Sequence, residues 1–444
     1  MARYKNTALN TFHLLLSTKM INPHAVGWVL ALSITIGTTG CSLNRPQNHA
    51  TFGSQAATAA APASGSPLTL RLYVDGHGSL YPDVALPNDQ LLKGGYKSSL
   101  LNYYYYPGNA AAITTLCQHY GVALPSPAVA TDIIHKDASQ HWAYIQQVLV
   151  KAAAQRINTA VSGPNNSFRP LIILIHGYNV GDQEHIAQRR HGRLQPTYYD
   201  TLQHALVLQR PELQNAVWLE VFWDGLRQNV PLTIWGAGQL NARYVGLRLR
   251  EVLAATNPAL PIRFFTHSSG GIVAAQTLWN SQAGFDSKYD LPEIRHWYEQ
   301  APTLQHQDIR VGMIVPALTP DAFKDYAHRT TLSGQTQTTN QPLYRIIVGQ
   351  NRKDLPTTKA FMPPTFLGST AMGCSEKAFN TAKEYCSCDL KRIDFCQTKP
   401  GHIPPRAYQF RLGPVPLVFW EVHDWRMYLH RDEASRKLLS AVLD

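Results

Sequence analysis

Ile262-Arg263-Phe264-Phe265-Thr266-His267-Ser268-Ser269-Gly270-Gly271 joins an apolar run to a group of small residues. The pattern predicts a short buried strand that turns sharply into a helix, with Ser268 in the turn. Such a turn strains the backbone of the serine and needs small residues on either side, so that strand and helix can approach each other. Gly270 meets this need on one side, whereas Thr266 stands on the other. Serine and glycine turns are common after strands, so the meaning of this one depends on the rest of the chain.

A second apolar run, Leu171–Ile175, ends in His176-Gly177-Tyr178-Asn179. The run predicts a fully buried strand. A His-Gly pair after such a strand resembles the oxyanion loop of the α/β-hydrolase superfamily. The resemblance implies that the glycine lets the backbone turn, so that the N–H of Tyr178 can point at the carbonyl oxygen of an acyl substrate as it becomes negative, and that the N–H of Ser269 is the second donor. His176 and Asn179 are further site candidates, although their side chains could equally cap the loop.

Other apolar runs predict further strands. Residues 310–315 and 343–348 are expected to be core strands, residues 216–223 are expected to form another strand, and residues 416–422 are the last strand candidate, with a helix at about 238–255 before the serine turn. Strands that alternate with helices favour the α/β class. The resemblance to α/β-hydrolases implies an open, mostly parallel central sheet flanked by helices.

Residues 171–430 resemble the α/β-hydrolase superfamily. Within it they are most similar to a bacterial branch that combines an HGYN oxyanion loop with an aromatic strand end, here Phe222-Trp223-Asp224. The resemblance implies a serine hydrolase that acts on an ester or related acyl bond. Thr266 departs from the glycine of the family's pattern, and Ser269 beside Ser268 leaves open a nucleophile shifted by one residue.

The resemblance also implies the chain order serine, acid, histidine. Asp354 lies in the loop after the run 343–348, where this fold keeps its acid, and Asp321 after the preceding run is the alternative. Either aspartate could instead be a helix N-cap. His423 follows the last apolar run and precedes a predicted helix at 424–429, so we expect it to be the general base.

The first 40 residues are typical of a targeting segment. Basic residues precede an apolar stretch at 25–37 that is short for a membrane span, and Thr38-Thr39-Gly40-Cys41 follows. Small residues before a cysteine resemble the bacterial lipobox, which implies that Cys41 is lipidated and becomes the mature N-terminus. Ser42 then favours an outer-membrane lipoprotein that faces the periplasm or the surface. An ordinary secretory signal or an uncleaved anchor is the alternative.

The composition divides the rest of the chain in two. Residues 41–67 contain almost no large apolar residue, which predicts a flexible linker. Residues 68–444 suit one α/β-hydrolase domain. Alternating apolar residues at 68–74 predict a strand that begins an N-terminal hairpin edge, and residues 142–156 trace an amphipathic helix.

Four cysteines cluster between the candidate acid and the candidate base. They are Cys374, Cys386, Cys388 and Cys396. In an oxidising compartment such a cluster favours two disulfides over zinc, because the spacing is not that of paired CxxC motifs. We therefore expect a Cys-rich insertion at about 356–412, before the last strand, which is either a lid over the site or an ordered surface segment.

The chain is basic, with 40 Lys and Arg against 29 Asp and Glu and a net charge of +11. These residues are scattered, and no basic helix or nucleic-acid motif accompanies them. We therefore expect no nucleic-acid partner, and the charge favours anionic envelope surfaces or acidic substrates.

These features together predict a serine hydrolase anchored in the cell envelope. His423 would deprotonate Ser268, Asp354 would orient the imidazole, and the substrate would be a small acyl ester or a lipid, with no cofactor or metal. Two alternatives remain. One is a binding or scaffold lipoprotein that keeps the fold without turnover, and the other is a phospholipase-like effector that shares the chemistry.

Overall fold

The computed structural model describes residues 67–82, 100, 110–121, 138–164, 167–178, 189–190, 193–194, 198–225, 235–281, 292–326, 328–330, 336–338, 342–358, 370–395, 407–412, 415–420, 423, 425–429 and 433–444. The predicted signal segment at 1–40, Cys41 and residues 42–66 of the predicted linker lie outside these ranges. Among the described residues, no helix has both the length and the apolar character needed to cross a bilayer.

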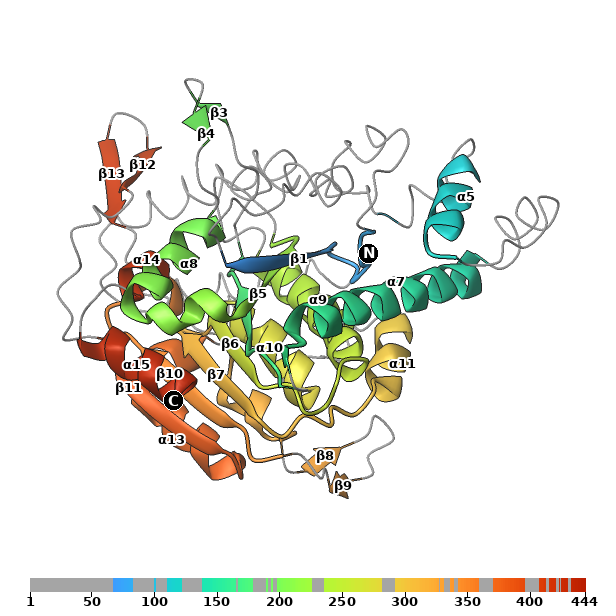
Figure 1. Cartoon of the computed structure of the whole chain (residues 1–444). Helices are drawn as coiled ribbons and strands as arrows, with labels where there is room; N and C mark the ends of the chain where they lie inside the picture. The colour runs from blue at the N-terminus through green and yellow to red at the C-terminus, as the bar shows by residue number, and fades with distance from the viewer. Residues whose placement is uncertain are drawn as a thin grey trace, which may run out of the picture. The chain divides into compact units, whose positions relative to one another are not determined.

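The centre of the structure is a sheet of seven strands that all run parallel (Figure 1). In spatial order the strands are β1 (Leu68–Val74), β5 (Val217–Trp223), β2 (Leu171–Ile175), β6 (Ile262–His267), β7 (Ile309–Ile314), β10 (Arg345–Gln350) and β11 (Asp389–Asp394). The predicted α/β class with a parallel sheet is therefore confirmed.

Helices flank this sheet (Figure 1). The described helices are α5 (Ala110–His119), α7 (Ala138–Val161), α8 (Tyr198–Gln209), α9 (Trp235–Ala254), α10 (Gly270–Trp279), α11 (Pro292–Gln300), α12 (Leu355–Thr358), α13 (Glu376–Tyr385), α14 (Trp425–Tyr428) and α15 (Glu433–Leu443), of which α5 stands away from the sheet (Figure 1). Single 3-10 turns form at η4 (Pro211–Asn215), η6 (Pro320–Phe323) and η7 (Ala371–Gly373). The described residues also form three two-stranded antiparallel sheets: β3 (Arg189–Arg190) with β4 (Arg193–Leu194), β8 (His328–Thr330) with β9 (Thr336–Thr338), and β12 (Ala407–Leu412) with β13 (Val415–Trp420).

The central strands are buried on both faces, as their mostly apolar sequences predict. All five residues of β2 are fully buried, and so are all seven of β5. Burial of one large aliphatic side chain contributes about 1.5–3 kcal/mol relative to exposure. These strands are therefore the most strongly held part of the fold, and the loops that follow them begin from fixed positions.

The last predicted strand does not belong to the central sheet. Residues 415–420 form β13, so a strand is present where the last one was predicted, but among the described residues it pairs with β12 in a separate two-stranded sheet. The edge position belongs instead to β11, which has one neighbour, β10, and leaves Lys391 exposed. An edge strand tolerates charged side chains, which is why its sequence does not resemble a core strand.

The Cys-rich segment is also more than an insertion. Between residues 371 and 395 it supplies η7, α13 and β11, and Phe379, Leu390 and Phe395 are buried in the main core. The expected boundary of the insertion at about 356–412 therefore encloses part of the central sheet. At the other edge, β1 pairs in parallel with β5 rather than in a hairpin, although Val74 forms an isolated antiparallel bridge with Leu80.

Because all seven strands are parallel, their carboxyl ends meet at one edge of the sheet. In open sheets of this kind, ligand sites lie outside this edge. The residues that follow β2, β6 and β10 are His176, Ser268 and the loop that leads to Asp354. Three of the predicted site segments therefore begin at the same edge of the sheet, those after β2 and β6 from neighbouring strands and that after β10 from two strands further along.

Candidate active site

Ser268 lies in the turn between β6 and α10, with a backbone φ of 52°. This left-handed conformation is uncommon for residues other than glycine. Two hydrogen bonds hold it: the N–H of Ser268 donates to the carbonyl of Ile314 over 3.1 Å, and the N–H of Ala317 donates to the carbonyl of Ser268 over 2.9 Å. The strand-to-helix turn expected from the sequence is present. Hydrogen bonds to residues at and just after the end of the neighbouring strand β7 hold Ser268 in its strained conformation.

Gly270 allows α10 to approach the end of β2 closely. A Cβ atom at this position would lie 2.5 Å from the carbonyl oxygen of Ile175 and 2.8 Å from that of His176. No side chain fits there. On the other side of the turn, Thr266 is 1 % exposed and occupies its strand position in register with Ile175. Threonine is thus accommodated where the hydrolase pattern has glycine.

The loop after β2 touches the serine. A Cβ atom on Gly177 would lie 2.9 Å from the Cβ atom of Ser268. Tyr178 follows Gly177 and packs closely against Gly225. A Cβ atom added to Gly225 would lie 3.1 Å from the Cα atom of Tyr178. Ser269 stands at the N-terminus of α10, where helical N–H groups have no acceptor within the helix. Gly177 and Ser268 are thus in close contact, and the two residues of the predicted oxyanion pair, Tyr178 and Ser269, directly follow them in the chain.

His176 has a structural environment rather than an open one. Its Nδ1 atom donates to the carbonyl of Gly177 over 2.5 Å, and its ring stacks on Trp223 with centroids 5.3 Å apart. The backbone N–H of His176 donates to the hydroxyl of Tyr199 over 3.0 Å. Burial lowers the pKa of His176 to about 4, so the ring is neutral at pH 7. Asn179, the other side-chain candidate in this loop, lies outside the described residues.

Asp354 and His423 form a buried pair. The Nδ1 atom of His423 donates to the Oδ2 atom of Asp354 over 2.7 Å, and Asp354 is fully buried. The Oδ1 atom of Asp354 accepts hydrogen bonds from the N–H and the hydroxyl of Thr357, over 2.9 and 2.8 Å. Tyr428 donates its hydroxyl proton to Oδ2 over 2.8 Å.

Burial alone would raise the pKa of Asp354. The attraction of His423 and the hydrogen bonds from His423 and Thr357 outweigh that effect, and the pKa of Asp354 is lowered from its ordinary value. The carboxylate is therefore ionised at neutral pH. In that state it favours the Nδ1–H tautomer of His423 and leaves Nε2 as the basic nitrogen.

His267 connects the pair of Asp354 and His423 to the serine turn. The ring of His267, the residue before Ser268, has its centroid 4.6 Å from that of His423 and stacks on Trp425 at 5.9 Å. Burial, followed by the proximity of His423, holds the pKa of His267 well below its usual range. The hydroxyl of Ser268 is buried and makes no hydrogen bond within the described part of the chain.

Asp321, the alternative acid, lies elsewhere. It is in η6, where its exposed carboxylate pairs with Lys324 over 2.7 Å. Of the two candidate aspartates, the structure brings Asp354 to His423. Asp354 also caps the short helix α12 through Thr357, so the capping role and the contact with His423 coexist in one side chain.

The sequence did not reveal two hydrogen-bond donors of this site, Thr357 and Tyr428. Thr357 is three residues after Asp354, the usual spacing of an N-cap and its partner, so this contact could have been predicted. Tyr428 is five residues after His423. That spacing carries no signal, because the contact depends on how α14 packs.

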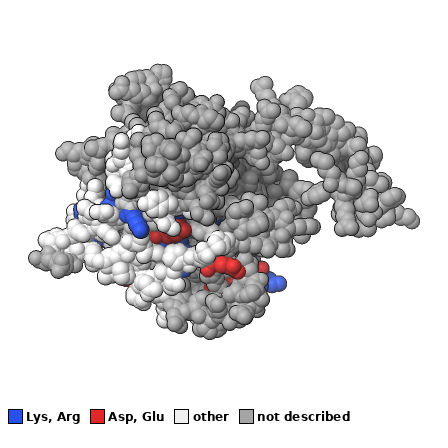
Figure 2. Space-filling view, turned by 90° about the vertical axis from the view of Figure 1, so that its right-hand side faces the viewer, with Lys and Arg blue, Asp and Glu red and all other residues white. Residues whose placement is uncertain are grey.

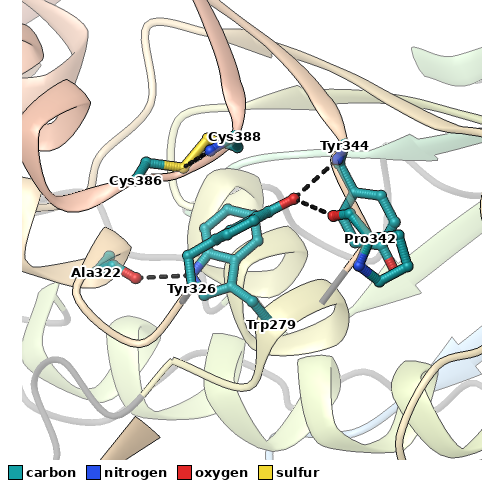
Figure 3. The surroundings of a disulfide bond; sticks show 7 residues. All are labelled: Trp279, Ala322, Tyr326, Pro342, Tyr344, Cys386 and Cys388. Atoms are coloured by element: carbon teal, nitrogen blue, oxygen red, sulfur yellow. Dashed lines mark hydrogen bonds between the residues drawn. A yellow bond between two sulfur atoms is a disulfide. The ribbon is translucent and has the colours of Figure 1, made fainter. Parts of the chain in front are cut away.

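The cysteine cluster is only partly described. The sulfur atoms of Cys386 and Cys388 are in contact, closer than the length of a disulfide bond (Figure 3). Cys374 donates through its Sγ atom to the carbonyl of Thr357 over 3.4 Å, and Cys396 lies outside the described residues. The pairing of the four cysteines therefore stays a prediction.

Among the described residues visible in Figure 2 are both basic and acidic side chains. Ion pairs such as Arg352 with Glu376, 2.6 Å apart, show the same mixing. Within the described ranges, no group of three or more His, Cys, Asp or Glu residues has the arrangement of a metal site. Comparisons with protein-family models, with curated proteins and with solved structures found no match to this chain.

Proposed function

We propose that this protein is a serine hydrolase of the α/β-hydrolase type that cleaves an ester or a related acyl bond. The observation that carries the proposal is the buried pair of Asp354 and His423, joined over 2.7 Å beside the strained turn of Ser268. A parallel sheet whose carboxyl edge supplies the serine and the acid supports it.

Each residue would have one role in the reaction. Asp354 accepts the Nδ1–H of His423, so that the Nε2 atom of His423 can take the proton of Ser268. The Oγ atom of Ser268 then attacks the acyl carbon. The N–H groups of Tyr178 and Ser269 stabilise the oxyanion. His423 then protonates the leaving group as the acyl bond breaks. Water repeats these steps on the acyl-enzyme and regenerates the free serine.

The serine hydroxyl does not bond to His423 in the structure, although both groups are buried. Hydrogen bonds of catalytic groups are often long in the free enzyme and shorten in the substrate complex. We therefore expect the contact between Ser268 and His423 to form when an acyl group occupies the site.

A fluorophosphonate probe tests the proposal, because it bonds covalently only to an activated serine. We expect stoichiometric labelling of the full chain and complete loss of labelling in Ser268→Ala. The matched control is Ser269→Ala, which removes the adjacent hydroxyl, also buried and without a described partner, and should retain labelling. If Ser269→Ala alone lost the label, the nucleophile would be shifted by one residue.

A protein that keeps this fold without turnover is the second candidate. The observation that favours it is the same lack of a hydrogen bond on Ser268. Absence of labelling in protein shown to be folded by circular dichroism would support this binding or scaffold role. If labelling succeeds, hydrolysis of a panel of short and long acyl esters would define the substrate class.

We also propose that Cys41 carries a lipid anchor, which would place the enzyme in the bacterial cell envelope, at the outer membrane. The support is the sequence alone, because residues 1–66 lie outside the described ranges. Cys41→Ala should move the protein from the membrane pellet to the soluble fraction after lysis. Unchanged sedimentation of the variant would contradict lipidation.

A further inference from the structure

Asp354 accepts two hydrogen bonds on the same oxygen atom. Besides the Nδ1–H of His423 at 2.7 Å, its Oδ2 atom accepts the hydroxyl proton of Tyr428 at 2.8 Å. Tyr428 is 4 % exposed, and its ring packs edge-on against Phe395, 5.2 Å between centroids. The hydroxyl is thus a buried donor with a fixed position.

A third side chain sets the direction of the Tyr428 proton. The Nδ2 atom of Asn351 donates to the Tyr428 oxygen over 2.9 Å. The Oδ1 atom of Asn351 accepts from the N–H of Lys353 over 2.9 Å, which fixes which end of the amide faces the tyrosine. Because an amide NH₂ group can only donate, the tyrosine oxygen accepts from Asn351 and directs its own proton to Asp354.

Tyr428 differs from the other donor to the carboxylate. Thr357 binds Oδ1 and is three residues after Asp354, so it ties the carboxylate to its own loop. Tyr428 and His423 come from one short segment and both reach Oδ2. Tyr428 therefore joins the acid to the segment that carries the base.

We propose that Tyr428, oriented by Asn351, is a positioning residue that holds Asp354 against His423 and limits the basicity of the imidazole. The proposal rests on the proposed function of the site. A donor on Oδ2 spreads the negative charge of the carboxylate, and this reduces its stabilisation of the imidazolium. The described titratable groups that surround His423 are Asp354, Tyr428 and His267.

The test is Tyr428→Phe, which removes the hydroxyl and keeps the ring against Phe395. Without the donor, the carboxylate stabilises the imidazolium more strongly. The titration midpoint of His423, followed by NMR, should rise by about half a pH unit or more. Fluorophosphonate labelling should slow about tenfold at its optimum, and its acidic limb should shift upward with the NMR midpoint.

Tyr326→Phe is the matched control. Tyr326 is a buried tyrosine whose hydroxyl also makes two hydrogen bonds, to the carbonyl of Pro342 over 2.7 Å and from the N–H of Tyr344 over 2.9 Å (Figure 3). It should cost similar stability and leave the His423 midpoint and the labelling profile unchanged. An equal shift in both variants would show a general loss of packing and would overturn the proposal.

A second variant keeps the proposal testable if Tyr428→Phe folds poorly. Asn351→Asp replaces the NH₂ donor by an acceptor that competes for the Tyr428 proton, and it should raise the His423 midpoint in the same direction. A wild-type midpoint in folded Tyr428→Phe or Asn351→Asp overturns the proposal. The NMR titration requires no turnover, so it gives an answer even if labelling fails and the proposed function is wrong.

Discussion

The serine turn and the acid–base pocket adjoin at one edge of the sheet but are held in opposite ways. In the turn, the side-chain oxygens of Thr266, Ser268 and Ser269 are buried and have no hydrogen-bond partner among the described residues. In the pocket, the carboxylate of Asp354 accepts four hydrogen bonds, two on each oxygen. Backbone sterics fix the first region, and electrostatics fix the second.

This difference determines which changes each region tolerates. A left-handed residue other than glycine costs about 1–3 kcal/mol, and the turn keeps Ser268 there because neighbouring backbone over-determines it. Added atoms should therefore disrupt the turn. The pocket depends on charge in a water-poor environment, where each donor counts strongly. A changed proton donor or acceptor should disrupt the pocket without any change in shape.

The largest effect is expected from Asp354→Asn in the pocket. The amide has the shape of the carboxylate but carries no charge, and one of its two ends is a donor. If the NH₂ group faces His423, it favours the wrong tautomer, and the proton of Ser268 has no acceptor. We expect the rate of fluorophosphonate labelling to fall about 10³–10⁴-fold.

The control for that variant is Asp321→Asn, which changes the exposed aspartate paired with Lys324. It should label at the wild-type rate. A loss of labelling in Asp321→Asn and not in Asp354→Asn would reverse the assignment of the acid.

The next effect, on the serine turn, is expected from Gly270→Ala. One added methyl group would lie 2.5 Å from the carbonyl oxygen of Ile175, a contact that only movement of β2 or α10 can relieve. We expect the free energy of unfolding to fall by about 3 kcal/mol, measured by urea denaturation. Gly238→Ala is the matched control, because its methyl group would meet the Cβ atom of Tyr178 at an ordinary 3.4 Å. It should be neutral or slightly stabilising, and an equal loss in both would contradict the steric account.

Much of the central sheet could be predicted because its strands are mostly apolar runs. The bounds of β2 agree with the prediction, and β5 and β7 differ by one residue at one or both ends. The chain order of serine, acid and histidine came from the resemblance to hydrolases. It identified Asp354 and His423, which the structure joins.

The remaining features depend on tertiary packing, which leaves no periodic signal. The edge strand β11 carries charged residues because only β10 pairs with it, so its sequence resembles a loop. Apolar residues at 416–422 predict the last strand, but within the described part of the chain β13 pairs with β12 and not with the central sheet. Tyr428 reaches Asp354 across 74 residues of chain, and only the fold brings them together.

The last effect is the pH dependence of stability in acid, which differs between the two regions. Burial holds the pKa of His176 at about 4 in the folded protein, against about 6.5 in an unfolded chain. Above pH 6.5 both states are neutral and the stability is complete. As the pH falls from 6.5 to 4, the unfolded chain binds a proton that the folded protein does not. His176 should therefore reduce the free energy of unfolding by about 1.4 kcal/mol per pH unit in this window.

Asp354 affects stability at lower pH than His176 does. Its pKa is lowered in the folded protein, so its contribution to the free energy of unfolding is lost only as the pH falls below the ordinary range of an aspartate. The loop beside the serine should thus weaken before the acid–base pocket does. His176→Phe, which keeps a ring on Trp223, should flatten the slope of stability between pH 6 and 4.5 in urea denaturation. Replacement of the exposed His296 by Gln should leave the slope unchanged. If the free energy of unfolding of His176→Phe fell with pH as steeply as that of the wild type, another group would be responsible for the loss of stability in acid.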